Sequence, residues 1–296
     1  TALGSYWKGR KPLILVRAIV LGILLPRTED EEQDLLVFEK IMAFDTGGLA
    51  RRVFAKGGLS ASLIASRLEL DKPWDYFTYT SKKYGSTTRE EISSVGFPID
   101  PDLVGISVRW RRDIEEEQKL DLIRRTLLTW ETYEEQAALA ARPEEVDQDW
   151  LYEPIWPDVN AHLGQFGVEA HSIDELIEQL GILRFGKRPK VGDTFCGGGS
   201  IPFEAARMGC DVYASDLNPI AAMLTWGALN IIGASAERRA EIEEHQHTVV
   251  EAVDREITEL GIEHDSGGNR AKAYLYCLET RCPETGWMVP LAPSWV

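Results

Sequence analysis

The chain has 296 residues, 44 % of them hydrophobic, and its 32 Lys and Arg against 48 Asp and Glu give a formal net charge of −16. This composition is typical of a globular protein with a substantial core, and it excludes a collagen-like, disulfide-dense or wholly disordered chain. The acidic balance argues against a chain that coats nucleic acid by itself, because phosphate binding depends on Lys and Arg. Four cysteines without a CxxC pair predict a reducing, cytoplasmic setting.

The N-terminal segment is basic and then apolar. No acid occurs before residue 29, and residues 12–26 form the most apolar run of the chain. The run is too short to span a bilayer and contains Arg17, so we predict a buried helix and no membrane partner. A signal peptide is the alternative, but no small-residue cleavage site follows. The chain has no initiator Met and stops at Val296, and we expect it to be part of a longer polypeptide.

The middle of the chain predicts helices separated by turns. Helical spacing and turn signals divide it as follows: a helix over 30–56 broken near 46–48, a mixed region over 57–110, an amphipathic helix or helix pair with a solvated face over 110–141, an irregular connector over 143–160, and a short helix over 172–180 stopped by Gly181.

Residues 188–232 have a different pattern. A short strand over 191–195 leads into Cys196-Gly197-Gly198-Gly199, a tight turn that favours glycine. We predict that Ser200 caps a helix that ends at Gly209. A second strand over 211–215 places Asp216 at its carboxyl end, and a further helix covers 219–229. The segment therefore predicts a strand, a glycine turn, a helix and a second strand that ends in an acid.

This order of elements favours a ligand that contains a nucleoside. Glycines let backbone amides approach the ligand, and an acid at the end of the next strand accepts both ribose hydroxyls. Gly197 and Asp216 are 19 residues apart, close to the roughly 20 expected of such units. Pro202 stands at the place of the third glycine of a dinucleotide motif. Asp193 would repel a pyrophosphate but suits a methionine amino group. These features favour S-adenosylmethionine over NAD; glycines that serve packing alone are the alternative.

The stretch DTFCGGGSIPFEAARMGCDVYASDLNP resembles the cofactor motif of amino-group methyltransferases. More narrowly, it is similar to the large adenine-specific DNA methylases that carry an N-terminal domain of unknown function, some of them associated with anti-phage defence. SYWKGRKPLILVRA and RCPETGWMVPLAPSW are similar to flanking segments of that family. The resemblance implies an α/β fold with a mostly helical N-terminal region over 1–160. The first part of a Rossmann-like, S-adenosylmethionine-binding methyltransferase domain would follow over 161–296. Its sheet would begin near residue 185 and be partial in this chain, and a helix and a Cys-containing turn would follow it.

The resemblance also implies roles for individual residues. The cofactor-binding residues would be Asp193, Phe195, Cys196, Gly197, Gly198, Gly199, Asp216, Leu217 and Asn218. Asp216 would bind the ribose, and the adenine ring would pack beside the two residues that follow it. The activity implied is methyl transfer from S-adenosylmethionine to the exocyclic amino group of adenine in DNA. DNA would be the substrate, and other subunits of a defence complex would be partners.

The sequence departs from the family at the catalytic motif. Amino methyltransferases of this kind use an (Asp/Asn)-Pro-Pro-(aromatic) tetrapeptide, and none occurs in the 296 residues. In related enzymes with this motif order the tetrapeptide lies downstream, so we expect it beyond Val296 and assign no catalytic residue. An RNA amino methyltransferase and a non-catalytic cofactor-binding subunit remain alternatives. An NAD-dependent oxidoreductase is disfavoured by Asp193 and Pro202.

Other chemical groups favour structural roles. Cys277 and Cys282 lack the further cysteine that a zinc ribbon has, so we predict two reduced thiols and no metal. His245 and His247 point to different faces of a charged helix. Cys196 is interpreted as a packing residue and not as a nucleophile. The basic residues between Tyr6 and Pro12 are equally compatible with a contact to phosphate or cofactor and with a plain surface extension.

Overall fold

The computed structural model describes residues 12–81, 85–86, 98, 106–271 and 278–291. Over these residues it is a mixture of helices, which account for 58 % of the structure, and small sheets of short strands, compatible with the expected α/β class. The chain divides into two compact units, Thr1–Asn230 and Ile231–Val296. The basic segment before Pro12 lies outside the described residues.

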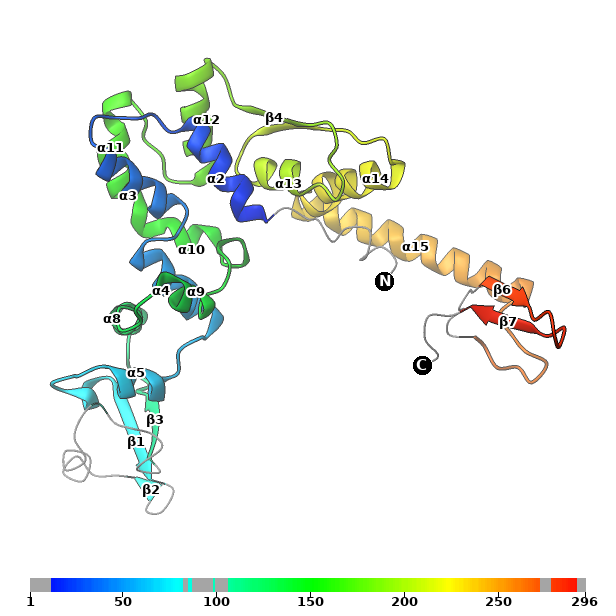
Figure 1. The fold of residues 1–296 in the computed structure, drawn as a ribbon, viewed down its shortest axis with the longest axis horizontal. Helices are drawn as coiled ribbons and strands as arrows, with labels where there is room; N and C mark the ends of the chain where they lie inside the picture. The colour runs from blue at the N-terminus through cyan, green and yellow to red at the C-terminus, as the bar shows by residue number, and fades with distance from the viewer. Residues whose placement is uncertain (1–11, 82–84, 87–97, 99–105, 272–277, 292–296) are drawn as a thin grey trace. The chain divides into compact units, whose positions relative to one another are not determined.

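The first unit holds most of the elements (Figure 1). Its α-helices are α2 (Leu13–Leu24), α3 (Glu31–Ile41), α4 (Thr46–Lys56), α5 (Ala61–Arg67), α8 (Glu116–Leu127), α9 (Tyr133–Ala138), α10 (Gln148–Tyr152), α11 (Trp156–Leu163), α12 (Ile173–Phe185), α13 (Ser200–Arg207) and α14 (Pro219–Gly227). Its strands are β1 (Phe77–Ser81), β2 (Gly85–Ser86), β3 (Ile106–Trp110), β4 (Lys190–Asp193) and β5 (Asp211–Ala214), and 3-10 turns η1 (Pro73–Asp75), η2 (Pro143–Glu145), η3 (Glu153–Ile155) and η4 (Gly164–Phe166) connect them.

Helix α2 confirms the prediction made from the apolar run. It begins after Pro12, and one side of it is buried, including Val20, Leu21 and Leu24. Arg17 is buried with them, at 2 % exposure. The break predicted near residues 46–48 lies slightly earlier. Asp45 accepts hydrogen bonds from two backbone amides, so it caps α4, and both glycines belong to the first turn of that helix.

Two hydrophobic cores organise the first unit. One core joins α2 and α3 to α10, α11, α12 and α13, and it includes Leu21, Leu151, Leu176 and Ala205. These residues lie on both sides of position 160, so the N-terminal helices and the segment with the glycine turn share one core. The division into domains over 1–160 and 161–296 remains a prediction.

The second core lies beneath a small antiparallel sheet. The strands are ordered β2-β1-β3, with Phe77 opposite Trp110 and Ser81 opposite Ile106. Side chains of β1 and β3 alternate between this core and solvent. The core is completed by α4, α5 and α8, with Val53, Ile64, Leu122 and Ile123 among its members.

The connector predicted over 143–160 is wrong, because this segment is largely helical. Each of its three prolines lies in the first turn of a helical segment: Pro143 begins η2, Pro154 lies in η3 and Pro157 lies in α11. Proline is tolerated there because the first amides of a helix have no intrahelical acceptor. The prolines therefore mark helix starts and not an irregular loop.

Helix α12 begins as predicted but continues beyond the predicted stop. Ser172 caps it, and the helix ends at Gly186, which has a φ of 70°. Gly181 lies inside the helix, where a Cβ atom would come within 2.3 Å of Cδ of Pro189. The glycine therefore permits close packing of the chain that returns towards β4.

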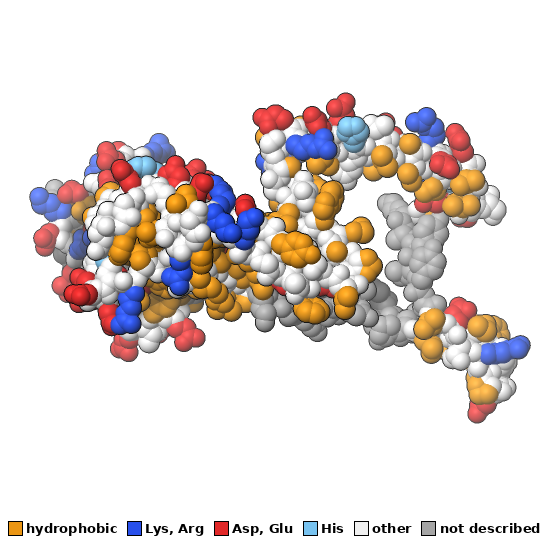
Figure 2. All heavy atoms as spheres, turned by 90° about the horizontal axis from the view of Figure 1, so that it is seen from above, with side chains coloured by type: hydrophobic (Ala, Val, Ile, Leu, Met, Phe, Trp, Pro, Cys, Tyr) orange, Lys and Arg blue, Asp and Glu red, His pale blue; other side chains and the backbone are white. Residues whose placement is uncertain are grey.

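The second unit contains a long helix and a hairpin. Helix α15 (Ala236–Leu260) has no buried residue, and it follows the π-helical turn η5 (Ala228–Ile232). Strands β6 (Leu278–Arg281) and β7 (Met288–Leu291) form an antiparallel hairpin. Apolar side chains reach the surface in several parts of the chain (Figure 2), among them Val249, Leu278 and Trp287.

We searched the described residues for membrane-spanning helices. None of them is, by itself, both long and apolar enough to cross a bilayer. Pro219–Ile232 and Ala236–Leu260 reach the length and hydropathy of a membrane span only when they are taken together.

Candidate functional site

Strands β4 and β5 bring the residues singled out by the sequence to one edge of a sheet. The strands are parallel, with Lys190 opposite Asp211 and Asp193 opposite Ala214. Helix α13 connects them and packs on both. Because the carboxyl ends of parallel strands meet at the same edge, the glycine turn after β4 lies beside Asp216 after β5.

Backbone hydrogen bonds define the shape of the glycine turn. The amide of Ser215 donates to the carbonyl of Asp193 at 2.9 Å, and the amide of Cys196 donates to the carbonyl of Ser215 at 3.0 Å. The amide of Gly199 then closes the turn on the carbonyl of Cys196 at 2.7 Å. The turn is therefore fixed to the end of β5.

Glycine is required at two positions of the turn. Gly197 and Gly199 have φ values of 51° and 76°, a region that residues with a Cβ rarely adopt. A Cβ atom on Gly199 would also come within 2.7 Å of Oγ1 of Thr225, on α14. Gly199 occupies the cap position of α13, so the expectation that Ser200 caps this helix is wrong. No side chain caps the helix, and its first amides are left to solvent or to a ligand.

Asp216 connects the two strand ends. One of its carboxylate oxygens accepts from the amide of Gly197 at 2.9 Å, and the other accepts from the amide of Asn218 at 2.8 Å. Hydrogen bonds from Asn218 and Gly197 hold the pKa of Asp216 below its ordinary value. Each carboxylate oxygen has a further lone pair, so the ionised group retains capacity to accept two hydroxyl groups.

Asp193 and Phe195 lie at the entrance to the turn. Asp193 ends β4, and its carboxylate accepts from the amide of Phe195 at 3.1 Å. The Phe195 side chain is 75 % exposed. The entrance to the turn therefore has a half-buried carboxylate and, two residues later, an exposed aromatic side chain.

Leu217 and Asn218 differ in what they offer. The Leu217 side chain is 91 % exposed, the largest exposure among the apolar side chains of the site. Asn218 accepts from the amide of Ile220 at 3.0 Å, and it thereby caps α14. Leu217 is therefore free to contact a ligand, whereas the Asn218 side chain has a structural partner.

Cys196 is enclosed within the turn. It is buried, and Oγ1 of Thr225 lies 3.4 Å from its sulfur atom. The same hydroxyl lies 3.4 Å from the carbonyl oxygen of Gly197. Cys196 therefore packs between the turn and α14, as expected of a structural residue.

A buried polar cluster lies behind α13, and sequence reasoning missed it. Arg17 of α2 donates from Nε to Glu204 of α13 at 2.9 Å, and it also binds Tyr152 and Gln148. Arg207 donates to the second Glu204 oxygen at 3.0 Å. Burial raises the pKa of the Tyr152 hydroxyl. The signal in the sequence was an arginine within an apolar helix, which requires a buried acceptor.

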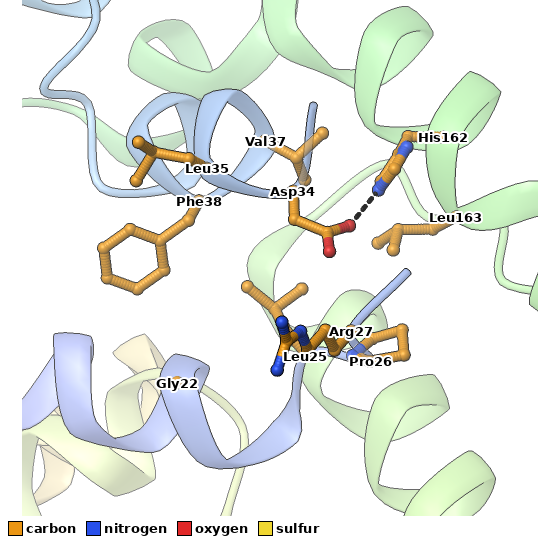
Figure 3. A pocket seen from close by; sticks show the side chains of 10 residues that line it. All are labelled: Gly22, Leu25, Pro26, Arg27, Asp34, Leu35, Val37, Phe38, His162 and Leu163. Carbon is orange, nitrogen blue, oxygen red and sulfur yellow. Dashed lines mark hydrogen bonds and ion pairs between the residues drawn. The ribbon is translucent and has the colours of Figure 1, made fainter. Parts of the chain in front are cut away.

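A separate cavity of about 230 Å³ lies between α2, α3 and α11 (Figure 3). Apolar groups line most of it, and Asp34 points towards His162, whose Nε2 lies 2.7 Å from the carboxylate. Burial opposes ionisation of Asp34, but hydrogen bonds from Thr28 and His162 outweigh it and lower the pKa of this carboxyl. The acid is thus already satisfied by protein donors.

The other cysteine and histidine side chains considered in the sequence are not part of the glycine turn or of the cavity beside Asp34. In the part of the chain that the structure describes, no three His, Cys, Asp or Glu side chains are placed to hold a metal ion. Cys282 is a free thiol in the β6–β7 hairpin, whereas Cys277 lies outside the described residues. His245 and His247 are exposed on α15.

Comparison with known proteins covers only the N-terminal segment. The model of a family described as a protein of unknown function (DUF1156) matches residues 1–41, which include α2 and α3. Searches of curated proteins and of solved structures gave no significant match.

Proposed function

We propose that the glycine turn and Asp216 bind S-adenosylmethionine, and that the protein is a methyltransferase of the adenine-specific DNA methylase type. The observation that carries the proposal is the hydrogen bond from the Gly197 amide to Asp216. It joins an acid that can accept ribose hydroxyls to a turn whose glycines allow close approach of the ligand. The uncapped N-terminus of α13 adds amide donors at the same edge.

The ligand is a sulfonium nucleoside and not a dinucleotide. Asp193 lies at the end of β4, where a carboxylate attracts the ammonium group of a methionine moiety and repels a pyrophosphate. Phe195 and Leu217 supply exposed apolar surface beside the two acids. Asp193 therefore binds the amino acid end, Asp216 binds the ribose, and Leu217 packs on the adenine ring.

The finer fold in this proposal is a Rossmann-like sheet that contains β4 and β5. Val191 and Val212 pack on the core beneath the sheet, whereas Tyr213 on the opposite face is 65 % exposed. Parallel sheets are usually covered on both faces. The exposed face at Tyr213 is therefore consistent with a larger sheet whose second face is covered by further elements. The alternative to a Rossmann-like sheet is a sheet of two strands, β4 and β5, whose role is to hold the glycine turn.

The reaction proposed is transfer of the sulfonium methyl group to the exocyclic amino nitrogen of adenine in DNA. The C–S bond breaks as the new N–C bond forms, the electron pair of the broken bond stays on sulfur, and the amino nitrogen loses one proton. The residues described here bind and orient the cofactor, and no catalytic residue is assigned to this chain. Partner subunits of a defence complex remain part of the same proposal.

The test has two stages. Calorimetry of the 296-residue chain should give saturable binding of S-adenosylmethionine and none of NAD. Methyl transfer is then assayed with the protein as it is encoded in full, because the 296 residues contain no catalytic tetrapeptide. Radiolabelled S-adenosylmethionine should label duplex DNA and not RNA of the same sequence. If only RNA is methylated, the protein is an RNA amino methyltransferase and not a DNA methyltransferase. The absence of an (Asp/Asn)-Pro-Pro-(aromatic) tetrapeptide favours a second candidate, a non-catalytic cofactor-binding subunit, for which binding without transfer would be the result.

A further inference from the structure

The charged pair between α2 and α13 joins distant parts of the sequence. Arg17 and Glu204 are 187 residues apart, and their side chains are 2 % and 1 % exposed. Both Nε and Nη2 of Arg17 lie within 2.9 Å of the same Glu204 oxygen. The pair therefore connects the segment matched by the family model to the helix that follows the glycine turn.

Further hydrogen bonds, from α13 itself and from neighbouring elements, hold the same two side chains. Arg207 binds Glu204 and donates to the carbonyl of Glu144 at 3.1 Å. Nη1 of Arg17 donates to the Tyr152 hydroxyl, and Nη2, which also lies against Glu204, donates to Oε1 of Gln148 at 3.1 Å. Both acceptors belong to α10. One carboxylate on α13 is thus held by two guanidinium groups, which are themselves fixed by α10 and η2.

This arrangement determines the position of α13 along α2. Apolar contacts alone do not fix how far one helix lies along another, because a shifted helix can form similar non-directional contacts. A slide by one helical turn moves a side chain by about 5.4 Å, which would leave Arg17 and Glu204 buried without partners. A buried polar pair of this kind selects one register.

The position of α13 in turn determines the glycine turn. Glu204 lies within two helical turns of Gly199, and the Phe203 amide donates to the Gly199 carbonyl at 2.9 Å. Gly199 has no space to move towards α14, because it lies directly against Thr225. We propose that Arg17 and Glu204 are a positioning pair, which holds the glycine turn at the distance from Asp216 that a bound nucleoside requires.

This inference rests on the proposed function for its ligand, so its test has one readout that needs no ligand. The variants are Arg17→Lys and Glu204→Gln, in the full 296-residue chain. The control is Leu122→Ala, which opens the second core and touches neither α2 nor α13. Variants and control are compared at a temperature where circular dichroism shows all of them folded.

The first readout is amide hydrogen exchange over residues 197–203, and the second is the Kd for S-adenosylhomocysteine. We expect exchange in this segment to be at least tenfold faster in both variants than in wild type, and the Kd to rise at least tenfold. Leu122→Ala should change neither. Unchanged exchange in the variants, or an equal change in the control, overturns the positioning role. If exchange is faster in both variants than in wild type, but the wild-type chain binds no nucleoside, the positioning role stands and only the proposed function is overturned.

Discussion

The backbone amide of Gly197 donates a 2.9 Å hydrogen bond to the carboxylate of Asp216, 19 residues later in the chain. The backbone amide of Asn218 donates a second hydrogen bond, at 2.8 Å, to the other oxygen of this carboxylate. The acid that would bind the ribose thus also organises the turn that would bind the rest of the ligand. Its ionisation is favoured by the same hydrogen bonds.

Replacement of Asp216 should weaken ligand binding. Asp216→Asn retains one oxygen acceptor but loses the charge and one acceptor oxygen. Hydrogen bonds to charged groups are worth about 1.5–3 kcal/mol, so we expect affinity for S-adenosylmethionine to fall about 10–100-fold. Calorimetry measures the change. Asp211→Asn, at the opposite end of β5, is the matched control and should bind as wild type; equal losses in both variants would argue against a ribose-binding role.

The packing of Gly199 on Thr225 gives a prediction about stability. Gly199→Ala introduces a Cβ atom at a φ of 76° and within 2.7 Å of the threonine hydroxyl. We expect the free energy of unfolding to fall by about 1–3 kcal/mol. Gly192→Ala in β4 is the control, because nothing lies within 4 Å of its added methyl group. Urea denaturation of both variants decides, and a Gly199→Ala chain as stable as wild type would contradict the geometry.

The pair behind α13 should show strong energetic coupling. Glu204→Met leaves Arg17 buried without its carboxylate partner, which costs about 3–5 kcal/mol of unfolding free energy. Arg17→Met should cost less, because Glu204 keeps its ion pair with Arg207. The double variant replaces both charges by apolar groups, so its loss should be clearly smaller than the sum of the single losses. Additive losses in urea denaturation would show that the two side chains do not act as a pair.

Cys210 and Cys282 should differ in their reactivity towards alkylating reagents. Burial raises the pKa of Cys210 to about 11, whereas hydrogen bonds from Thr285 and Glu284 lower the pKa of Cys282. Since the thiolate is the reactive form, Cys282 should be alkylated by iodoacetamide at a lower pH than Cys210. Peptide mass spectrometry across a pH series measures both rates. Faster alkylation of Cys210 in the folded chain would contradict these environments.

Local patterns in the sequence predicted the backbone structure around the glycine turn. Positive φ angles require glycine at positions 197 and 199, and a turn of this kind between two short strands is recognisable within 30 residues. The apolar run over 12–26 predicted α2, because its hydrophobic residues recur at helical spacing. The structure places Gly197 and Asp216 in direct contact, as expected of the two strand ends. Whether these residues bind a cofactor remains a prediction.

Features that depend on distant partners could not be predicted. Arg17 finds Glu204 only after 187 residues of chain have folded, and no local rule connects them. Gly181 was interpreted as a helix stop, because a glycine that ends a helix and a glycine that permits close packing look alike in sequence. The three prolines of 143–160 indicated irregular structure, although proline is equally typical of a first helical turn.

Titration of the 296-residue chain with S-adenosylmethionine and, separately, with NAD is the most direct test of the central claim. The account predicts saturable binding of S-adenosylmethionine alone, and loss of that binding when Asp193 and Asp216 are both replaced by asparagine. Binding of NAD in preference to S-adenosylmethionine, or full affinity in the double variant, would contradict it.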